Sequence, residues 1–184
     1  MYKHKSSIDQ HHGSNTLSKA FNQGIISSEL IEEYYVLIAG SRTITDKKWI
    51  INLINLDLDS QGIINLNEST DDILRSKYNI TIVSGGATGV DFIAECYAKK
   101  YHLPFKLFPA NWELNGKSAG FIRNEQMHQF ISHFKNRIVL CYKDQNSTGK
   151  GTTHSISLGD KYNNTVIFNV LGDNNVLDRT IYMH

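Results

Sequence analysis

The run SGGATGVD, residues 84–91, decides the fold of this chain. It follows a β-branched stretch at residues 80–83 and leads into a periodic segment at residues 90–101, so it predicts a strand, a glycine turn and a helix. Glycines let a ligand approach the backbone, and the helix behind them presents free N–H groups to an anion. The turn matches neither GxGxxG nor a Walker loop. It is therefore either a phosphate site or a purely structural turn.

The alternation of strand and helix continues on both sides of this turn. We expect strands at residues 35–39, 80–84, 105–109, 137–142 and 165–170, and helices at residues 46–58, 90–101, 119–134 and 152–162. Short apolar strands separated by amphipathic helices form a parallel sheet that is covered on both faces. The sequence thus predicts a Rossmann-like three-layer α/β/α fold with a mostly parallel sheet. Within the long connection at residues 60–79 we expect a short helix at 71–77, capped by Ser69 or Thr70.

Length and composition fit one domain of this kind, since 184 residues with 40% hydrophobic content can bury one substantial core. We expect the domain at residues 31–172, after a polar, flexible arm at residues 1–30 and before a loose tail at residues 173–184. The arm contains His4, His11 and His12 without acidic or cysteine partners, so we predict no metal site there.

Several classes of function do not match the sequence. The formal net charge of +1 argues against nucleic acid as a partner, because duplex-binding proteins carry a broad basic surface. No stretch approaches the roughly 20 apolar residues of a membrane span, and no secretory leader is recognisable. The two cysteines, Cys96 and Cys141, lack zinc-ligand spacing. We therefore expect a cytoplasmic protein without membrane contact, metal or cofactor.

Small, polar or basic residues follow four consecutive predicted strands. Ligands of open parallel sheets bind beyond the carboxyl ends of the strands, near the point where the strand order reverses. A structural explanation for all four groups at once is weaker than for any one of them, so we expect them to form one site. The candidates are Gly40, Ser41 and Arg42 after the first strand, Gly85, Gly86, Thr88, Gly89 and Asp91 after the second, Trp112, Lys117, Arg123 and Asn124 after the third, and Gly151 and Thr152 after the fourth.

The loop before the last predicted helix does not form a nucleoside-triphosphatase motif. A Walker loop needs a glycine five residues before its Gly-Lys pair and a hydroxyl residue directly after it. Asp144 and Gly151 stand at those places around Gly149 and Lys150. We set triphosphate hydrolysis aside on this ground.

Charged candidates have a structural and a functional interpretation each. Arg123 shares a helical face with Met127 and Phe130. Because the rest of that face is apolar and expected to be buried, the Arg123 guanidinium needs an anionic partner. That partner is either an acid, Asp91 or Glu95, or the phosphate or carboxylate of a ligand. The two acids lie one helical turn apart. They could orient ribose hydroxyls or act at an anomeric carbon, or serve only as a helix N-terminal charge and a solvated surface group.

Two residues that follow the third strand also have two interpretations each. Trp112 could stack on a base or nicotinamide ring, or cap the core. Lys117 lies between Gly116 and Gly120 in a segment suited to closing over phosphate, but it could equally be a solvated surface lysine.

The strings GSRTITD at residues 40–46, SGGATGVDFIAE at 84–95, PANWELNGKSAGFIRNEQM at 109–127 and GKGTTHSI at 149–156 resemble the YspA-like branch of the SLOG superfamily. Relatives of that branch include lysine-decarboxylase-like phosphoribohydrolases and the DNA-processing protein DprA. The resemblance runs from about residue 35 to residue 170. It implies a Rossmann-like fold whose glycine loops bind nucleotides or nucleotide-derived ligands, such as ADP-ribose derivatives or cyclic nucleotide signals.

The resemblance also implies roles for the candidate residues by position. The first and fourth groups would line the ligand pocket, the glycines of residues 85–89 and Thr88 would hold phosphate, Asp91 would lie at the ribose, and Arg123 with Asn124 would contact phosphate or ribose. The hydrolases carry a PGGxGTxxE signature, from which this chain departs: Ser84 replaces the proline, the turn is one residue longer, and the acids fall out of register.

Binding of such a ligand, as a sensor or sequestering module, is therefore the function that the sequence predicts. Cleavage of an N-glycosidic bond, with Asp91 or Glu95 stabilising the developing ribose charge or activating water, is an alternative. DprA-like binding of single-stranded DNA is a third possibility, which the near-neutral charge disfavours. Because relatives often pair subunits around the site, we also expect a homodimer or larger homo-oligomer.

Overall fold

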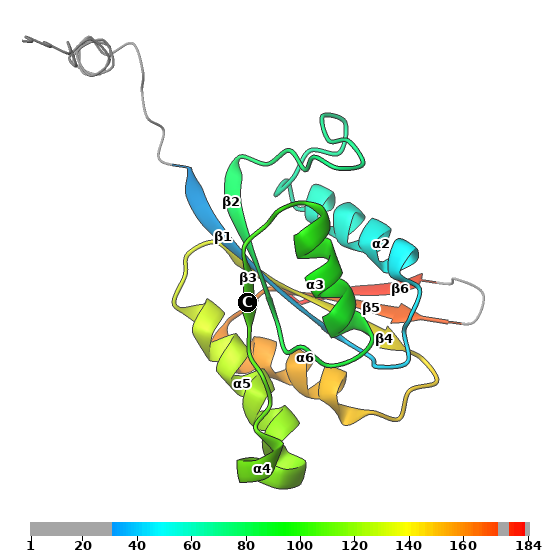
Figure 1. Ribbon diagram of the computed structural model, residues 1–184, viewed down its shortest axis with the longest axis vertical. Helices are drawn as coiled ribbons and strands as arrows, with labels where there is room; N and C mark the ends of the chain where they lie inside the picture. Colours follow the sequence, from blue (N-terminus) through cyan, green and yellow to red (C-terminus); the bar gives the residue numbers. More distant parts are fainter. Residues whose placement is uncertain (1–30, 173–176, 183–184) are drawn as a thin grey trace, which may run out of the picture. The chain divides into compact units, whose positions relative to one another are not determined.

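The computed structural model describes residues 31–172 and 177–182. The predicted N-terminal arm and its histidines lie outside the described residues. The elements in chain order are β1 (Glu32–Gly40), α2 (Lys47–Ser60), β2 (Tyr78–Ser84), α3 (Val90–Lys100), β3 (Phe105–Leu107), α4 (Trp112–Asn115), the 3-10 turn η1 (Gly116–Ser118), α5 (Ala119–Ser132), β4 (Arg137–Asp144), α6 (Lys150–Tyr162), β5 (Val166–Leu171) and β6 (Leu177–Tyr182) (Figure 1).

The strands form one sheet in the order β3-β2-β1-β4-β5-β6. β1 to β5 are parallel, and β6 pairs with β5 in the antiparallel direction. The chain first builds outward from β1 to β3 and then crosses back to β4 on the other side of β1. This order confirms the predicted Rossmann-like fold and puts the topological switch point between β1 and β4.

Helices cover both faces of the sheet, α2 and α3 on one and α5 and α6 on the other (Figure 1). The apolar run of β1 is continuous because the strand is covered on both faces of the sheet. Val36 and Ile38 belong to the cluster under α2 and α3, whereas Leu37 and Ala39 belong to the cluster under α5. All four side chains are buried, as expected for a central strand whose successive residues point to opposite, covered faces.

The helix that we expected at residues 71–77 is absent, and this prediction was wrong. The segment consists of turns closed by an antiparallel bridge between Ile64 and Ser76. The Ser69 hydroxyl donates to the carbonyl oxygen of Asn65 and accepts from the N–H of Arg75. Ser69 therefore satisfies backbone groups of a folded loop, which competes with its use as a helix cap.

A loose tail after Gly172 was also expected, and this is wrong for residues 177–182. These residues form β6, which runs alongside β5 with Leu171 opposite Leu177. Without β6, the N–H and C=O groups on the outer edge of β5 would have no strand partner. The rest of the predicted tail, residues 173–176 and 183–184, lies outside the described residues.

No helix in the described part of the chain is long and apolar enough to span a bilayer. The same residues contain no cluster of three or more side chains that could hold a metal ion.

Candidate functional site

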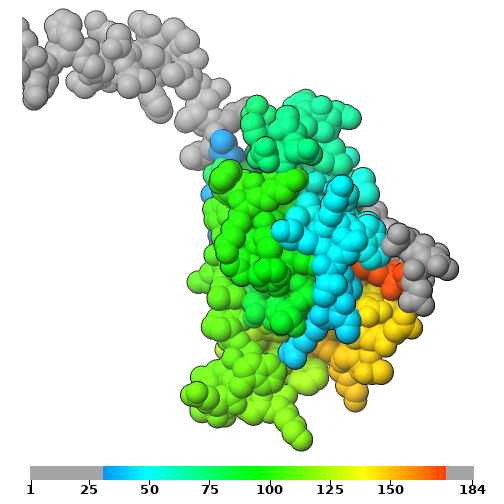
Figure 2. Space-filling model, turned by 45° about the vertical axis from the view of Figure 1, so that its right-hand side comes forward, coloured from blue at the N-terminus to red at the C-terminus, as the bar shows by residue number. Residues whose placement is uncertain are grey.

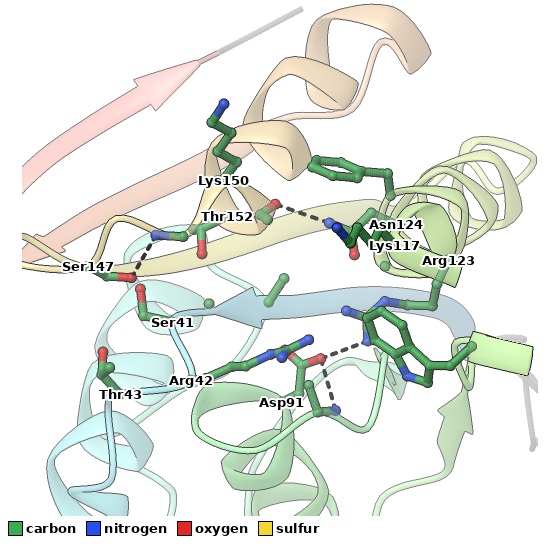
Figure 3. A pocket seen from close by; sticks show the side chains of 18 residues that line it. Ser41, Arg42, Thr43, Asp91, Lys117, Arg123, Asn124, Ser147, Lys150 and Thr152 are labelled. Atoms are coloured by element: carbon green, nitrogen blue, oxygen red, sulfur yellow. Dashed lines mark hydrogen bonds and ion pairs between the residues drawn. The ribbon is translucent and has the colours of Figure 1, made fainter. Parts of the chain in front are cut away.

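A cavity of about 330 Å³ opens at the carboxyl ends of the strands, where the loops after β1 and β4 meet (Figure 3). The Ser41 hydroxyl accepts from the N–H of Asp144 at 3.0 Å, and the Thr43 hydroxyl donates to the Asp144 carboxylate at 2.5 Å. These contacts hold the two loops together at the switch point. The hydrogen bonds from Thr43 and from the N–H of Asn146 lower the pKa of Asp144, so its carboxylate stays charged as an anchor.

Most of the predicted site residues line this cavity together. They are Gly40, Ser41, Arg42, Asp91, Trp112, Lys117, Arg123, Asn124, Gly151 and Thr152. The structure thus brings residues from all four predicted strand ends to one place, as a switch-point site requires.

The other candidates lie elsewhere. Gly85, Gly86, Thr88 and Glu95 line a neighbouring hollow of about 510 Å³, which shares Arg42, Ala87, Trp112 and Arg123 with the cavity. Gly89 lines neither space. Its φ is +76°, and a Cβ there would lie 2.4 Å from the carbonyl oxygen of Ser41, so this position needs glycine to pack two loops together.

Sequence reasoning did not single out Phe121, Ala87 or Ala39, which also line the cavity. Phe121 could have been found from helical spacing, because residues 117, 120, 121 and 124 lie on one side of a helix. Thr43, Gly120, Ser147, Gly149 and Lys150 complete the lining. They lie within the predicted loops and the start of α5 but were not chosen as site residues.

Arg123 forms a buried ion pair with Asp91. Its Nη1 atom lies 3.1 Å from Asp91 Oδ2, and the two side chains are 10% and 4% exposed. The structure therefore supplies the acid partner that the sequence left open, and that partner is Asp91. Glu95 instead pairs with Lys99 at 2.6 Å near the surface.

Gly85 makes room for this pair. A Cβ built on Gly85 would lie 1.6 Å from Arg123 Nη1, so the guanidinium lies directly against the backbone of the glycine turn. Asp91 also accepts from the N–H of Ala87 at 3.3 Å. Burial raises the pKa of Asp91, and the Arg123 guanidinium and neighbouring backbone N–H groups act against this rise.

Two buried polar atoms beside this pair have no hydrogen-bond partner among the described residues: Arg123 Nε and Asn124 Oδ1. The Asn124 amide nitrogen donates to the carbonyl oxygen of Gly151 at 3.0 Å, which ties α5 to the first turn of α6. An unsatisfied buried polar group costs about 1–3 kcal/mol. This corner of the cavity therefore offers one donor and one acceptor to an incoming group.

The charged residues of the cavity lining are mostly basic. Arg42, Lys117, Arg123 and Lys150 line it, against the single acid Asp91. The Lys150 ammonium points away from the other labelled side chains (Figure 3). Arg42 and Lys117, which have no carboxylate partner among the described residues, then give the cavity a positive potential for an anion.

Trp112 stands at the border between the cavity and the neighbouring hollow and lines both. Its side chain is 51% exposed, so it does not cap the core, and the Arg42 guanidinium carbon lies 5.9 Å from its ring centroid. The surrounding segment with α4 projects at the lower end of the domain in Figure 2. An exposed indole at the mouth is suited to stack on a planar ligand group.

A buried histidine lies one helical turn beyond Asn124 on α5. The ring of His128 is 2.8 Å from the Ser155 hydroxyl through Nε2, and its Nδ1 faces the Asn164 amide nitrogen at 3.3 Å. Since the amide nitrogen of Asn164 can only donate, Nδ1 of His128 accepts this hydrogen bond and Nε2 carries the proton. Burial lowers the pKa of His128 to about 3, so the ring is neutral and joins α5 to α6 behind the cavity.

Comparison with known proteins agrees with this architecture. Residues 34–114, from β1 through most of α4, match the profile of the YspA, cpYpsA-related SLOG family. This part of the chain belongs to this SLOG family. The part of the SLOG domain that matches includes the loop after β1, the glycine turn and Asp91, whereas Arg123, Asn124 and the start of α6 lie beyond it.

A curated protein that is similar to this chain is the gene 61 protein of Mycobacterium phage D29. It is 32% identical over 97 residues, which span 50% of this chain and 66% of the phage protein. The match to the family suggests binding or processing of nucleotide-related molecules.

Proposed function

We propose that this protein binds a nucleotide or nucleotide-derived ligand in the cavity, as a sensor or a sequestering module. The observation that carries the proposal is the cavity of about 330 Å³ at the switch point, whose charged lining residues are four bases and one acid, and beside which two polar atoms have no hydrogen-bond partner among the described residues. A cavity of this size suits a small molecule with phosphate and sugar hydroxyls. Trp112 at the mouth supplies a surface for a base. ADP-ribose derivatives and cyclic nucleotides are the ligand types that the family resemblance favours.

The first test is mass spectrometry of small molecules released from the denatured protein, followed by thermal shift with AMP, ADP, ADP-ribose and cyclic AMP. A ligand that binds only the folded state raises the melting temperature by mass action. We expect one of these nucleotides to do so and to be recovered intact. Arg42→Ala and Lys117→Ala should reduce the shift, whereas Lys48→Ala, an exposed lysine outside the cavity, should leave it unchanged. No shift with any nucleotide would refute the proposal.

Hydrolysis of an N-glycosidic bond is the second candidate. It is favoured by Asp91, a buried carboxylate in the cavity whose raised pKa would suit a general base that activates water. Against it, the carboxylate is held by Arg123, and Glu95 lines only the neighbouring hollow. Incubation with the bound nucleotide separates the two: free base that no longer appears with Asp91→Asn would make the protein a hydrolase.

The expected homo-oligomer and cytoplasmic location stay predictions.

A further inference from the structure

A further hollow, of about 520 Å³, adjoins the cavity on the side of α6 and shares four lining residues with it. Two lysines, a histidine and three hydroxyl side chains contribute to its lining: Lys143, Lys150, His154, Thr148, Thr153 and Ser157. We call this space the lysine hollow. Neither Lys143 nor His154 lines the cavity, and the family resemblance implies a role for neither.

The lysine hollow is built from side chains on the flank of α6 and at the end of β4. Residues 150, 153, 154 and 157 follow one another by three or four positions and therefore share one side of the helix. Lys143 is the last residue but one of β4. It alternates with Val139 and Cys141, which face α5, so its side chain lies on the same face of the sheet as α6.

The positive charge of the lysine hollow is not neutralised within the described part of the chain. No acidic residue is among its lining residues, and neither Lys143 nor Lys150 has a carboxylate partner there. Glu125, an acid on the neighbouring helix α5, is bound by the Lys161 ammonium and by the Tyr162 hydroxyl at 2.9 Å. Two unpaired ammonium groups at one concave surface attract an anion.

His154 gives a second indication that a polar group binds in the lysine hollow. Its Nδ1 atom is buried and has no hydrogen-bond partner among the described residues. A buried ring nitrogen without a partner is costly, and a ligand group bound beside it would supply the missing hydrogen bond. The ring is held in place by Phe121, whose ring centroid lies 4.8 Å away at an interplanar angle of 84°.

Phe121 and Lys150 connect the lysine hollow with the cavity, because both residues line both spaces. The phenyl side chain is 41% exposed, so it forms a wall that is open to solvent rather than a part of the core. The Lys150 ammonium points away from the labelled side chains of the cavity (Figure 3). A ligand bound in the cavity can therefore extend past Phe121 toward the two lysines.

We propose that the lysine hollow binds a second phosphate group of the ligand, separate from the part of the ligand that occupies the cavity, and that Lys143, Lys150 and His154 contact this group. The ligand class is then a nucleotide that carries phosphates at two positions of its sugar, a nucleoside bisphosphate. This inference rests on the proposed function, because it specifies which nucleotides the same protein prefers.

The test compares AMP with two adenosine bisphosphates, which carry the second phosphate on the 2′ or the 3′ oxygen, by calorimetry. We expect at least one bisphosphate to bind about tenfold more tightly than AMP, as one or two charge-assisted hydrogen bonds provide. Lys143→Gln should remove most of this preference and change the affinity for AMP little, because Lys143 lies outside the cavity lining. Lys77→Gln, an exposed lysine before β2 at the opposite end of the sheet, should keep the preference.

Ser157 provides a second pair of variants that does not depend on Lys143. Ser157 is exposed on α6, and glutamate and glutamine both suit a helix. Ser157→Glu puts a negative charge into the lysine hollow, and Ser157→Gln is the neutral control of the same shape. We expect the bisphosphate to bind about tenfold more weakly to Ser157→Glu than to Ser157→Gln, with a much smaller difference for AMP.

Two results would overturn the second phosphate site and leave the proposed function standing. One is that AMP binds but neither bisphosphate binds more tightly than AMP. The other is that the preference for a bisphosphate survives in Lys143→Gln and in Ser157→Glu. If the unaltered protein binds no nucleotide at all, the proposed function fails and this inference fails with it.

Discussion

At the residue scale, glycine turns here serve packing as much as ligand approach. The sequence indicated that the turn needs glycine at residues 85, 86 and 89, but not that Gly85 lies under a guanidinium and Gly89 against the loop after β1. Those contacts are made between residues far apart in the chain, and no local pattern reports them. For the same reason the sequence could show that Arg123 needs an anion, yet could not choose among Asp91, Glu95 and a ligand.

Gly85→Ala should break the pair between Arg123 and Asp91, because the new methyl group would take the place of the guanidinium. Disrupting a buried ion pair costs about 3 kcal/mol, and we expect a loss of that order in the free energy of unfolding in urea. Gly120→Ala is the matched control. It lies in α5, where a Cβ makes an ordinary 3.6 Å contact with Trp112, and alanine favours the helix. A Gly85→Ala protein as stable as the unaltered one would contradict the structural account of Arg123.

At the element scale, the strands and long helices were predictable because their apolar residues repeat with the period of the structure they form. The two failures have a common cause. Residues 71–77 and 177–182 take their structure from partners, a hydroxyl network at Ser69 and the open edge of β5, rather than from their own periodicity. The same limit explains the contact between α5 and α6, which depends on a buried histidine that looks like any other in sequence.

His128 should make the contact between α5 and α6 sensitive to acid. The pKa of His128 in the folded protein is about 3, below its usual value, so folding favours the neutral ring. The stability that the neutral ring contributes is therefore present above about pH 6.5 and is lost as the pH falls toward 3. Between pH 7 and pH 5 the expected loss is about 2 kcal/mol from this residue. His128→Gln should reduce the pH dependence measured by urea unfolding, whereas His133→Gln, an exposed histidine on the same segment, should not. An unchanged pH dependence in His128→Gln would refute this.

At the scale of the whole molecule, charge is distributed unevenly. The chain carries a formal net charge of +1, yet basic residues outnumber acids four to one around the cavity. Only the net charge follows from the composition, because lysines and arginines that the fold brings together are dispersed along the chain. A positive potential confined to a cavity selects small anions, whereas nucleic acid needs a long basic surface that tracks its backbone.

Salt dependence should therefore separate nucleotide binding from DNA binding. Few phosphates are neutralised in the cavity, so the affinity for a mononucleotide should fall only about threefold to tenfold between 50 and 200 mM salt, near the change expected for one or two contacts. A fluorescent single-stranded 20-mer, followed by anisotropy in the same buffers, should show no binding at 150 mM salt. Because Arg42 lines the cavity and has no carboxylate partner among the described residues, Arg42→Ala should flatten the salt dependence for the nucleotide. Tight binding of the oligonucleotide with a steep salt slope would instead support DprA-like function and count against the cavity as the principal site.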